Sequence, residues 1–570
     1  KGLSLDQLLQ QQSLAFIRSY GAGNLATISL RGATSSQTSL IWNGVPVNNS
    51  MLGLADVSNV PVDGFDQLAL DFGTEAILYG SSSIGGNIRL ESELSFKSGY
   101  AYKAQIGLGS FGRRQLHYES SWSNKRFSFN TKMGAINSKN DFEIQQSNHR
   151  QSNSAVNRNY LMHTMGWKAS ENTRIKLDYW KQSANRQVPP TIRQTISNAY
   201  QLDGADRIVL GLKTVVGPWL LDGKVSYMNE RLDYFDPTIL LSSPSSIQTR
   251  FTKAEAQRHF GDLKLHFGLE GRNNQAESSG YGNIREEQNY QAIFGKLKYN
   301  KTIWSAEFSV RQGRFNNRWI PFIPAADIRY GDPANWMVFA GFSGQYRIPS
   351  LNELYWRPGG NQELLPEHGW SSEIGTRRYM KFDDKWQSHI QLNGFYRNVD
   401  NWLQWTIPEG GSLFRALNLN EIISYGIESK WQNQYVRHEW SICFDLSYTF
   451  VRSYSMKDLR IPKRSSGEQL HYLPRHRTIA QFNMEFHSWN VIYTHQYQSS
   501  MDGFNKLVDA YQLGDLSLAY HFKHYRSHQF SLQFELRNIW NREYEIVEFR
   551  PMPGRHYQLS IIYSLFKPDE

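Results

Sequence analysis

Apolar and polar residues alternate through most of the chain, from residue 96 onward, in segments of roughly ten residues. In the segment 304–311, Ser, Glu and Arg occupy every second position, and the positions between them are apolar. The segments 389–398 and 556–566 alternate in the same way, with one exception each. Successive strand residues point to opposite faces, so the pattern predicts strands with one apolar and one polar face. Clusters of Gly, Asn, Ser and Asp separate the segments and predict turns. The apolar positions of the segment 304–311 are Trp304, Ala306, Phe308 and Val310.

The first 95 residues follow a different pattern, which predicts a small α+β unit. Leucines at helical spacing follow Ser4, a good N-cap residue, and Gly21 is a possible stop, so we expect one short amphipathic helix within residues 4–21. Short apolar runs and Gly-centred turns fill residues 25–90, and Asn43-Gly44 predicts a tight hairpin. We therefore expect one domain over residues 1–95 and an all-β domain over residues 96–570.

Composition narrows the class of the larger domain. Aromatic residues make up 14% of the 570 residues, whereas the mean hydropathy is −0.57. No run of about 18 apolar residues occurs, which excludes transmembrane helices. A polar average with many aromatics is typical of a membrane β-barrel, in which alternate residues face lipid and a wet lumen. Alternation alone leaves half-buried sheets of a soluble protein as the alternative.

Charge and cysteine content exclude some other readings. The formal net charge is +10, but Lys and Arg are spread over strands and loops instead of clustering as nucleic-acid-binding residues do. We expect an anionic outer leaflet, and no nucleic acid, to be the partner of this charge. The single cysteine, Cys443, cannot form an intrachain disulfide and is expected to be an inert strand residue.

Several short motifs follow one another in a recognisable order. They are Arg31-Gly32, Asn43-Gly44-Val45 and the run LYGSSSIGGNI at 78–88. This order resembles the plug domain of TonB-dependent outer-membrane receptors and transporters. The resemblance implies an all-β membrane protein: a 22-stranded antiparallel transmembrane β-barrel, occluded by the N-terminal α+β plug and located in the cell outer membrane. Chain length alone also allows a 16-stranded barrel.

A second block, YRIPSLNELYWRPGGNQELLPEHGWSSEIG at 346–375, resembles the barrel signature of the same family, in particular its cobalamin-transporter-like branch of Bacteroidetes type. Weaker matches follow at 395–405, 418–428, 473–477 and 538–557. The resemblance implies TonB-dependent active import of a scarce large nutrient, with cobalamin or another corrinoid favoured. Ferric siderophores and oligosaccharides stay open as cargo, because specificity lies in loops that no short motif encodes.

The resemblance also implies which residues meet the cargo. The plug loop 48–54 corresponds to an apical loop that faces the extracellular vestibule and contacts cobalamin. Its amides and hydroxyl suit the amide arms of a corrinoid, and its apolar residues give adaptable contact. Two aromatic residues in the second block suit stacking on a large ligand, with interface anchoring or loop packing as the alternative. The expected substrate-binding residues are Asn48, Asn49, Ser50, Met51, Leu52, Tyr355 and Trp356.

A plug–barrel contact is implied in the same way. In the family, a plug arginine after the first strand meets barrel glutamates; Arg31 matches it, and Glu373 and Glu428 match the partners. A buried arginine needs such carboxylates. A second plug arginine usually precedes the LYGS run, but this chain has the acidic segment 71–75 there. Because of that departure, the sequence leaves open whether the complete plug–barrel charge cluster of the family is present.

The remaining expectations concern partners and chemistry. Residue 1 is not followed by a signal peptide, so we expect a mature or trimmed chain, with a TonB-binding segment upstream of it. Outer-membrane lipids, lipopolysaccharide and a surface lipoprotein lid are further expected partners. Nucleophile-elbow, phosphate-loop and metal-ligand motifs are missing, so we expect neither an enzyme nor a cofactor or metal. The rival hypothesis is a transporter-like structural or surface-docking subunit of an outer-membrane complex, with uptake lost.

Overall fold

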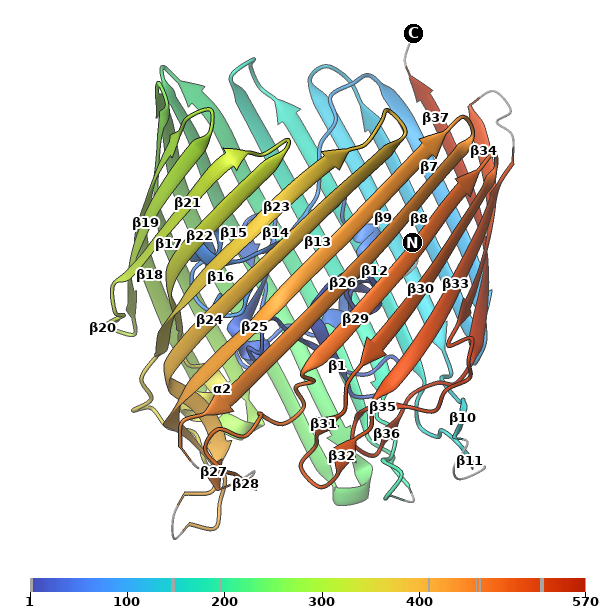
Figure 1. Cartoon of the computed structure of the whole chain (residues 1–570). Helices are drawn as coiled ribbons and strands as arrows, with labels where there is room; N and C mark the ends of the chain where they lie inside the picture. Colours follow the sequence, from blue (N-terminus) through green and yellow to red (C-terminus); the bar gives the residue numbers. More distant parts are fainter. Residues whose placement is uncertain are drawn as a thin grey trace.

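The computed structural model describes residues 4–144, 149–194, 196–408, 411–457, 459–460, 463–522 and 527–568. Over these residues, 22 long strands pair antiparallel in chain order and close into a barrel, as predicted, because β37 pairs with β7 (Figure 1). The strands are β7 (Gly99–Gly109), β8 (Arg113–Ser123), β9 (Phe127–Ser138), β12 (Val156–Lys168), β13 (Thr173–Gln187), β14 (Tyr200–Val216), β15 (Trp219–Asp236), β16 (Leu241–Phe260), β17 (Leu263–Ser278), β18 (Arg285–Asn300), β19 (Trp304–Phe315), β21 (Ile323–Asp332), β22 (Trp336–Arg347), β23 (Glu367–Lys381), β24 (Trp386–Thr406), β25 (Arg415–Arg437), β26 (Trp440–Ser455), β29 (His476–Phe486), β30 (Trp489–Gln498), β33 (Tyr511–His521), β34 (His528–Arg537) and β37 (His556–Pro568).

The plug contains one helix and two small sheets. One sheet has the order β4-β3-β6-β5, and the other pairs β1 with β2. Asn43 and Gly44 both have positive φ, at 49° and 83°, which makes the predicted tight hairpin between β3 and β4. The elements are α1 (Leu5–Gln12), β1 (Phe16–Ser19), β2 (Ala26–Ser29), β3 (Thr38–Trp42), β4 (Val45–Pro46), β5 (Gln67–Asp71), β6 (Gly86–Glu91) and the 3-10 turns η1 (Ser35–Gln37), η2 (Val57–Asn59), η3 (Val62–Gly64) and η4 (Gly73–Tyr79).

The helix is shorter than the spacing predicted. It ends at Gln12 and not near Gly21, because the residues after it form strand β1 and pair with β2. Ser4 occupies the N-cap position, but its side chain makes no capping hydrogen bond. At the other end, the guanidinium of Arg477 from β29 donates to the carbonyl oxygens of Gln10, Ser13 and Ala15. Tertiary contacts therefore decide where α1 ends.

The faces of the barrel strands confirm the alternation, with the apolar face outside. In β19, Trp304 and Phe308 are 38% and 50% exposed, whereas Glu307 and Arg311 are 5% and 1% exposed. A soluble sheet would bury the apolar face instead. Among the residues described, no helix is long and apolar enough to cross a membrane.

The two rims of the barrel differ. At one rim, uppermost in Figure 1, short turns join the strands, and the C-terminal end of the chain lies there. The other rim carries long segments, with helix α2 (Leu351–Tyr355) and four small hairpins. Long loops mark the extracellular side of such barrels and short turns the periplasmic side. The extra strands at the long-loop rim are β10 (Glu143–Ile144), β11 (His149–Arg150), β20 (Arg318–Trp319), β27 (Leu459–Arg460), β28 (Lys463–Arg464), β31 (Met501–Asp502), β32 (Leu507–Val508), β35 (Glu545–Val547) and β36 (Arg550–Pro551), with η5 (Pro237–Ile239) and η6 (Ser279–Tyr281).

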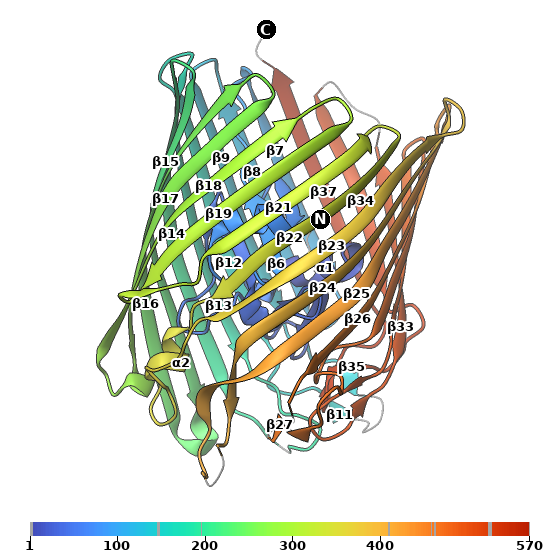
Figure 2. The ribbon, with the colours of Figure 1, turned by 60° about the vertical axis from the view of Figure 1, so that its left-hand side comes forward.

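The plug lies inside the barrel and shares its core with the wall. In Figure 2 the plug is visible through and behind the strands, in blue. One cluster of buried side chains joins Leu5, Trp42 and Ile88 of the plug to Trp180 and Phe251 of the barrel. The rings of Trp42 and Trp180 meet edge to face, with centroids 5.3 Å apart. The plug therefore fills the lumen at the level of these strands.

Candidate functional site

A cavity of about 520 Å³ separates the plug from the barrel wall on the long-loop side. Its floor is formed by the plug loop around Asn49, and its wall by β13 to β16. Four of the predicted substrate-binding residues line it, whereas Asn48, Ser50 and Tyr355 do not. The four lining residues are Asn49, Met51, Leu52 and Trp356.

The two asparagines shape the plug loop. Asn48 Oδ1 accepts a hydrogen bond from the backbone N–H of Leu40 (2.7 Å), and its Nδ2 donates to the carbonyl of Thr38 (2.9 Å). Asn49 Oδ1 accepts from the backbone N–H groups of Met51 (3.0 Å) and Leu52 (3.1 Å), which closes an Asx-type turn. The amide of Asn48 is thus committed to strand β3, and Asn49 presents its turn to the cavity.

The plug loop is hydrogen-bonded to the second sequence block. The carbonyls of Ser50 and Met51 accept from the backbone N–H groups of Leu351 and Asn352, both at 3.0 Å. These donors belong to the first turn of α2, where helical N–H groups lack partners within the helix. Two motifs separated by almost 300 residues therefore build one edge of the cavity.

The loop residues and the two aromatics divide between packing and exposure. Met51 is 4% exposed and packs in a cluster with Tyr281, whereas Leu52 is 39% exposed. The ring centroid of Tyr281 lies 6.3 Å from that of Tyr355 and 6.4 Å from that of Trp356. The Tyr355 hydroxyl donates to a barrel carbonyl, so loop packing accounts for this residue. Trp356 both packs against Tyr281 and lines the cavity.

Charged residues of the wall, which the sequence motifs did not indicate, form ion pairs beside the cavity. Arg186 donates to Asp56 of the plug (2.5 Å) and to Asp203 of β14 (2.9 Å). Arg207 pairs with Glu230, and its guanidinium lies 4.4 Å from the Trp180 ring. Alternation predicts that these residues point inward, but nothing in the sequence says which inward residues converge here. To find them, one would need the register in which neighbouring barrel strands pair, and only the three-dimensional structure gives that register.

The electrostatics hold the plug turn next to the cavity. Burial alone raises the pKa of Asp56, but Arg186 and the backbone and side-chain hydrogen bonds outweigh it, so the net pKa is lowered. Asp56 Oδ1 accepts from the backbone N–H groups of Ala26 and Ser58, both at 3.1 Å. An anionic Asp56 therefore joins two plug turns to the barrel.

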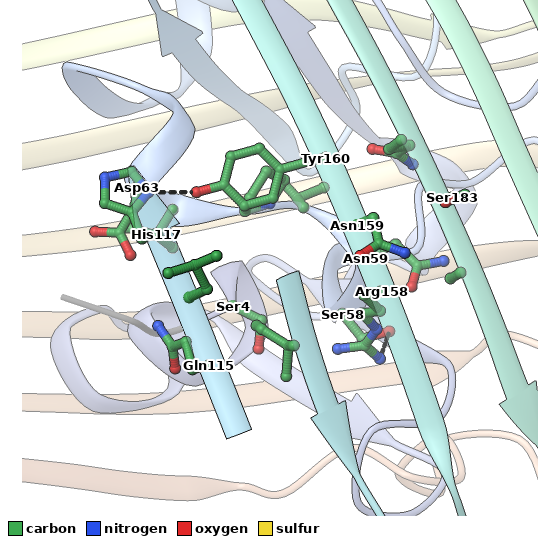
Figure 3. Close-up of a pocket in the computed structure, with 17 residues that line it drawn as sticks. Ser4, Ser58, Asn59, Asp63, Gln115, His117, Arg158, Asn159, Tyr160 and Ser183 are labelled. Atoms are coloured by element: carbon green, nitrogen blue, oxygen red, sulfur yellow. Dashed lines mark hydrogen bonds between the residues drawn. The ribbon is translucent and has the colours of Figure 1, made fainter. Parts of the chain in front are cut away.

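A second, much smaller cavity lies between the plug turn η2–η3 and strands β8 to β13 (Figure 3). It measures about 30 Å³, which is room for about one or two waters. Tyr160 and His117 meet across it at 2.7 Å, and Arg158 donates to Ser58 (3.2 Å). This seam attaches the plug and is too small for a nutrient.

Arg31 lies where the motif comparison expected it, between plug and barrel. Its guanidinium donates to Glu428 (2.8 Å) and to Glu373 (2.9 Å), and the side chain is 12% exposed. The rings of Phe72 and Phe395 flank it at 4.0 and 5.0 Å. Burial lowers the pKa of Arg31, but the two carboxylates outweigh this and raise it, so the group is always charged.

The plug turn η4, in the region where the family's second arginine is missing, is held by barrel cations. The buried guanidinium of Arg311 donates to the carbonyls of Ile77 (3.3 Å) and Leu78 (3.5 Å) and pairs with Glu270 of the barrel (2.8 Å). Lys296 pairs with Glu75 of the plug at 3.1 Å. At η4 the barrel therefore supplies the cations and the plug supplies the oxygen partners, which is the reverse of the contact made by Arg31.

Within the described part of the chain, no group of three or more His, Cys, Asp or Glu is placed to hold a metal ion. The groups that line the large cavity offer hydrogen bonds, ion pairs and aromatic contact.

Family comparisons agree with this architecture. The family model described as "TonB dependent receptor-like, beta-barrel" matches residues 99–539, and that described as "TonB-dependent Receptor Plug Domain" matches residues 1–87. The chain is 23% identical to the vitamin B12 transporter BtuB of Photobacterium profundum, over 98% of this chain and 90% of that protein. It is also 23% identical to BtuB of Vibrio vulnificus, over 72% of this chain and 66% of that protein.

Solved structures with the same fold carry other substrates in their names. The FrpB iron transporter of Neisseria meningitidis has a TM-score of 0.80 at 13% identity, covering 99% of this chain and 96% of that one. The copper transporter OprC has a TM-score of 0.78 at 16% identity, covering 97% and 94%. At 13–16% identity, the likeness to these structures establishes the fold alone. Membership of the Bacteroidetes-type branch stays a prediction. Because the barrel family model alone matches most of the chain, this protein belongs to the TonB-dependent receptor family and is an outer-membrane transporter with a plug inside its barrel.

Proposed function

We propose that this protein imports cobalamin or another corrinoid. The observation that carries the proposal is the meeting of the plug loop and Trp356 in one open cavity, in a chain that matches a vitamin B12 transporter along 98% of its length. Ligand sites of large molecules are typically concave and largely apolar, with a few well-placed polar groups. The cavity has this character, with Leu52, Leu232 and Trp180 beside amides and charged groups.

The chemistry of a corrinoid suits these residues. Its flat ring system presents apolar faces and edges to Trp356 and Leu52, and its amide arms both donate and accept hydrogen bonds. Donors and acceptors of both kinds line the cavity: Asn49, Gln182, Gln201 and Arg207. A corrinoid is larger than about 520 Å³, so it would enter edge first and extend into the open mouth.

Import needs energy that the outer membrane lacks, and we propose that an inner-membrane TonB complex supplies it. The plug fills the lumen, and several buried ion pairs between plug and barrel hold it, so cargo cannot pass unless the plug moves or rearranges. A pull on a segment N-terminal to α1 would act first on the pairing of Ser4 with Pro61 and on the hydrogen bond from Leu5 to Val60. It would act next on the contacts of Arg477 at the C-terminal end of that helix.

A surface lipoprotein lid is a further part of this proposal. Large apolar side chains protrude from the loops of the long-loop rim, among them Leu240, which is 92% exposed. Exposed apolar groups of this kind mark contact surfaces when they gather around one opening. The others include Ile239, Ile284, Phe322, Leu365, Leu413, Phe414 and Phe504.

Equilibrium binding tests the cargo. The detergent-purified protein is titrated with cyanocobalamin and, separately, with ferric siderophores. We expect a corrinoid Kd of about 1 μM or tighter, corresponding to about −8 kcal/mol. Trp356→Ala should weaken it at least tenfold, whereas Trp370→Ala, a matched change on the outer wall, should not. Siderophore binding without corrinoid binding would make this an iron transporter, and binding of neither would favour the structural-subunit hypothesis.

A further inference from the structure

The outward face of the barrel carries a hollow that the transport site does not use. It spans strands β14 to β19 and has a volume of about 780 Å³. Its floor consists of small residues, because a Cβ placed on Gly223 would meet no atom within 4 Å, and Ala254 and Gly271 stand beside it on the next two strands. Larger apolar side chains surround the floor: Leu210, Leu212, Val225, Leu269 and Ile293.

The aromatic residues near the periplasmic ends of these strands fix the level of the hollow. Trp219, Phe260 and Trp304 are outward-facing and partly or largely exposed there, as interfacial aromatics are. A strand tilted by about 40° rises about 2.5 Å per residue along the membrane normal, so about ten positions span the apolar band of about 25 Å. The hollow residues that share a strand with these aromatics and lie below its outer edge stand four to eight positions from them, which places the hollow from the middle of the membrane into the outer leaflet. They are Gly223, Val225, Thr252, Ala254 and Gln312.

Two outward-facing cations lie at or next to the outer edge of the hollow: Arg314 lines it, and Arg250 stands two positions beyond Thr252, which lines it. Arg250 stands ten positions from Phe260 on β16, and Arg314 stands ten positions from Trp304 on β19, so both reach the outer interface. Both are exposed, and neither forms an ion pair with any carboxylate among the residues described. The Trp319 side chain, 70% exposed, lies 5.9 Å from the Arg314 guanidinium.

We propose that this hollow binds lipopolysaccharide: one acyl chain of its lipid A lies over Gly223, Ala254 and Gly271, and its two phosphates pair with Arg250 and Arg314. The two arginines are three strands apart, about 14 Å at the usual strand spacing, so each reaches a separate anionic group. A headgroup with two separated phosphates fits this arrangement better than a phospholipid with one. Arginine binds phosphate oxygens in bidentate fashion, and the low-polarity surroundings strengthen the pair.

The proposal rests on the outer-membrane location of the barrel and not on the identity of the cargo. Purified protein in detergent is titrated with bisphosphorylated lipid A, monophosphoryl lipid A and phosphatidylglycerol, and bound lipid is counted by native mass spectrometry. Heat-modifiable migration in gel electrophoresis, which reports an intact barrel, shows that each variant of the same preparations is folded, and it keeps this question separate from that of the cargo.

The double variant Arg250→Gln/Arg314→Gln should bind lipid A at least tenfold more weakly, and Gly223→Leu, which fills the hollow, at least threefold. Arg258→Gln is the matched control, because this outward arginine stacks on Phe260 at the periplasmic level. The charge-preserving Arg250→Lys/Arg314→Lys should keep most of the affinity. Unchanged lipid A binding in both test variants would overturn the site. Equal binding and equal loss with phosphatidylglycerol would overturn lipopolysaccharide as its occupant.

Discussion

Two of the buried contacts that attach the plug to the barrel have opposite polarity. At the first, the plug supplies the cation, Arg31, and the barrel supplies Glu373 and Glu428. At the second, the barrel supplies Arg311 and Lys296, and the plug offers backbone carbonyls and a carboxylate. Both are more than surface ion pairs, because the guanidinium groups lie in a protein interior.

The difference between the two contacts shows that a tightly held plug does not require the cation to come from a particular motif of the plug. A buried cation needs oxygen partners whichever domain carries it, since the cost of its desolvation is the same. The acidic segment 71–75, which departs from the family pattern of a second plug arginine, is therefore compatible with a tightly held plug. Within the plug, Arg89 pairs with Asp71, so one of these acids stabilises the segment itself.

The largest effect is expected from Arg31→Met. It leaves two buried carboxylates without their cation, which typically costs about 3–5 kcal/mol. Hydrogen exchange of the plug amides in β2 and β3, followed by mass spectrometry, would measure the loss as faster opening. The control is Arg329→Met, a half-exposed barrel arginine. Unchanged exchange in β2 and β3 would contradict the importance of the first contact.

Arg311→Met should have the next largest effect, on the other contact. Glu270 loses its guanidinium partner, and the carbonyls of Ile77 and Leu78 lose a donor, at a combined cost of about 3 kcal/mol. Faster exchange should be confined to η4 and β6. Since the two contacts share no residue, the losses in the double variant should add within about 0.5 kcal/mol. Strong coupling would show that the plug is released as one unit.

Glu75→Gln should have a smaller effect. This carboxylate is 44% exposed, so solvent screens its pair with Lys296, and we expect about 0.5–1 kcal/mol. The protection of η4 against exchange measures it. A loss as large as that of Arg311→Met would mean that Glu75, and not the carbonyl contacts, holds the segment.

Acid should weaken the plug gradually and only slightly. Burial alone raises the pKa of Glu75 and Asp56, but Lys296 and Arg186 outweigh it, and the folded-state pKa values lie below the ordinary 4.5 and 3.8. Their contribution is therefore complete above those ordinary values and is lost as pH falls through the lower folded-state values. Plug exchange, corrected for intrinsic rates, should be constant from pH 7 to about 5 and accelerate below about 4. Acceleration already at pH 6 would implicate a histidine instead.

The sequence predicted the barrel and the first contact for different reasons. Period-two alternation identifies each strand and its outward face, as in β19, because every second side chain meets lipid. Arg31 and its glutamates were found because they stand in recognisable motifs. The second contact was not, since Arg311, Lys296 and Lys253 are ordinary inward strand residues, and only register brings them to η4.

The cavity that we propose as the cargo site was predictable in the same limited way. The plug loop and the 346–375 block were both identified, but their backbone hydrogen bonds through Leu351 and Asn352 required the three-dimensional structure. The wall residues Arg186 and Arg207 carry no motif. Likewise, a helix pattern that extends to residue 21 gave no indication that strand β1 would interrupt it.

Cobalamin uptake by intact cells tests the whole account most directly. Cells that depend on the full chain are given radiolabelled cyanocobalamin, with and without a protonophore that collapses the inner-membrane gradient. Accumulation above the external concentration, abolished by the protonophore and greatly reduced by Trp356→Ala, is the predicted result. Uptake equal to that of cells lacking the protein would contradict it and favour a barrel that serves as a docking subunit.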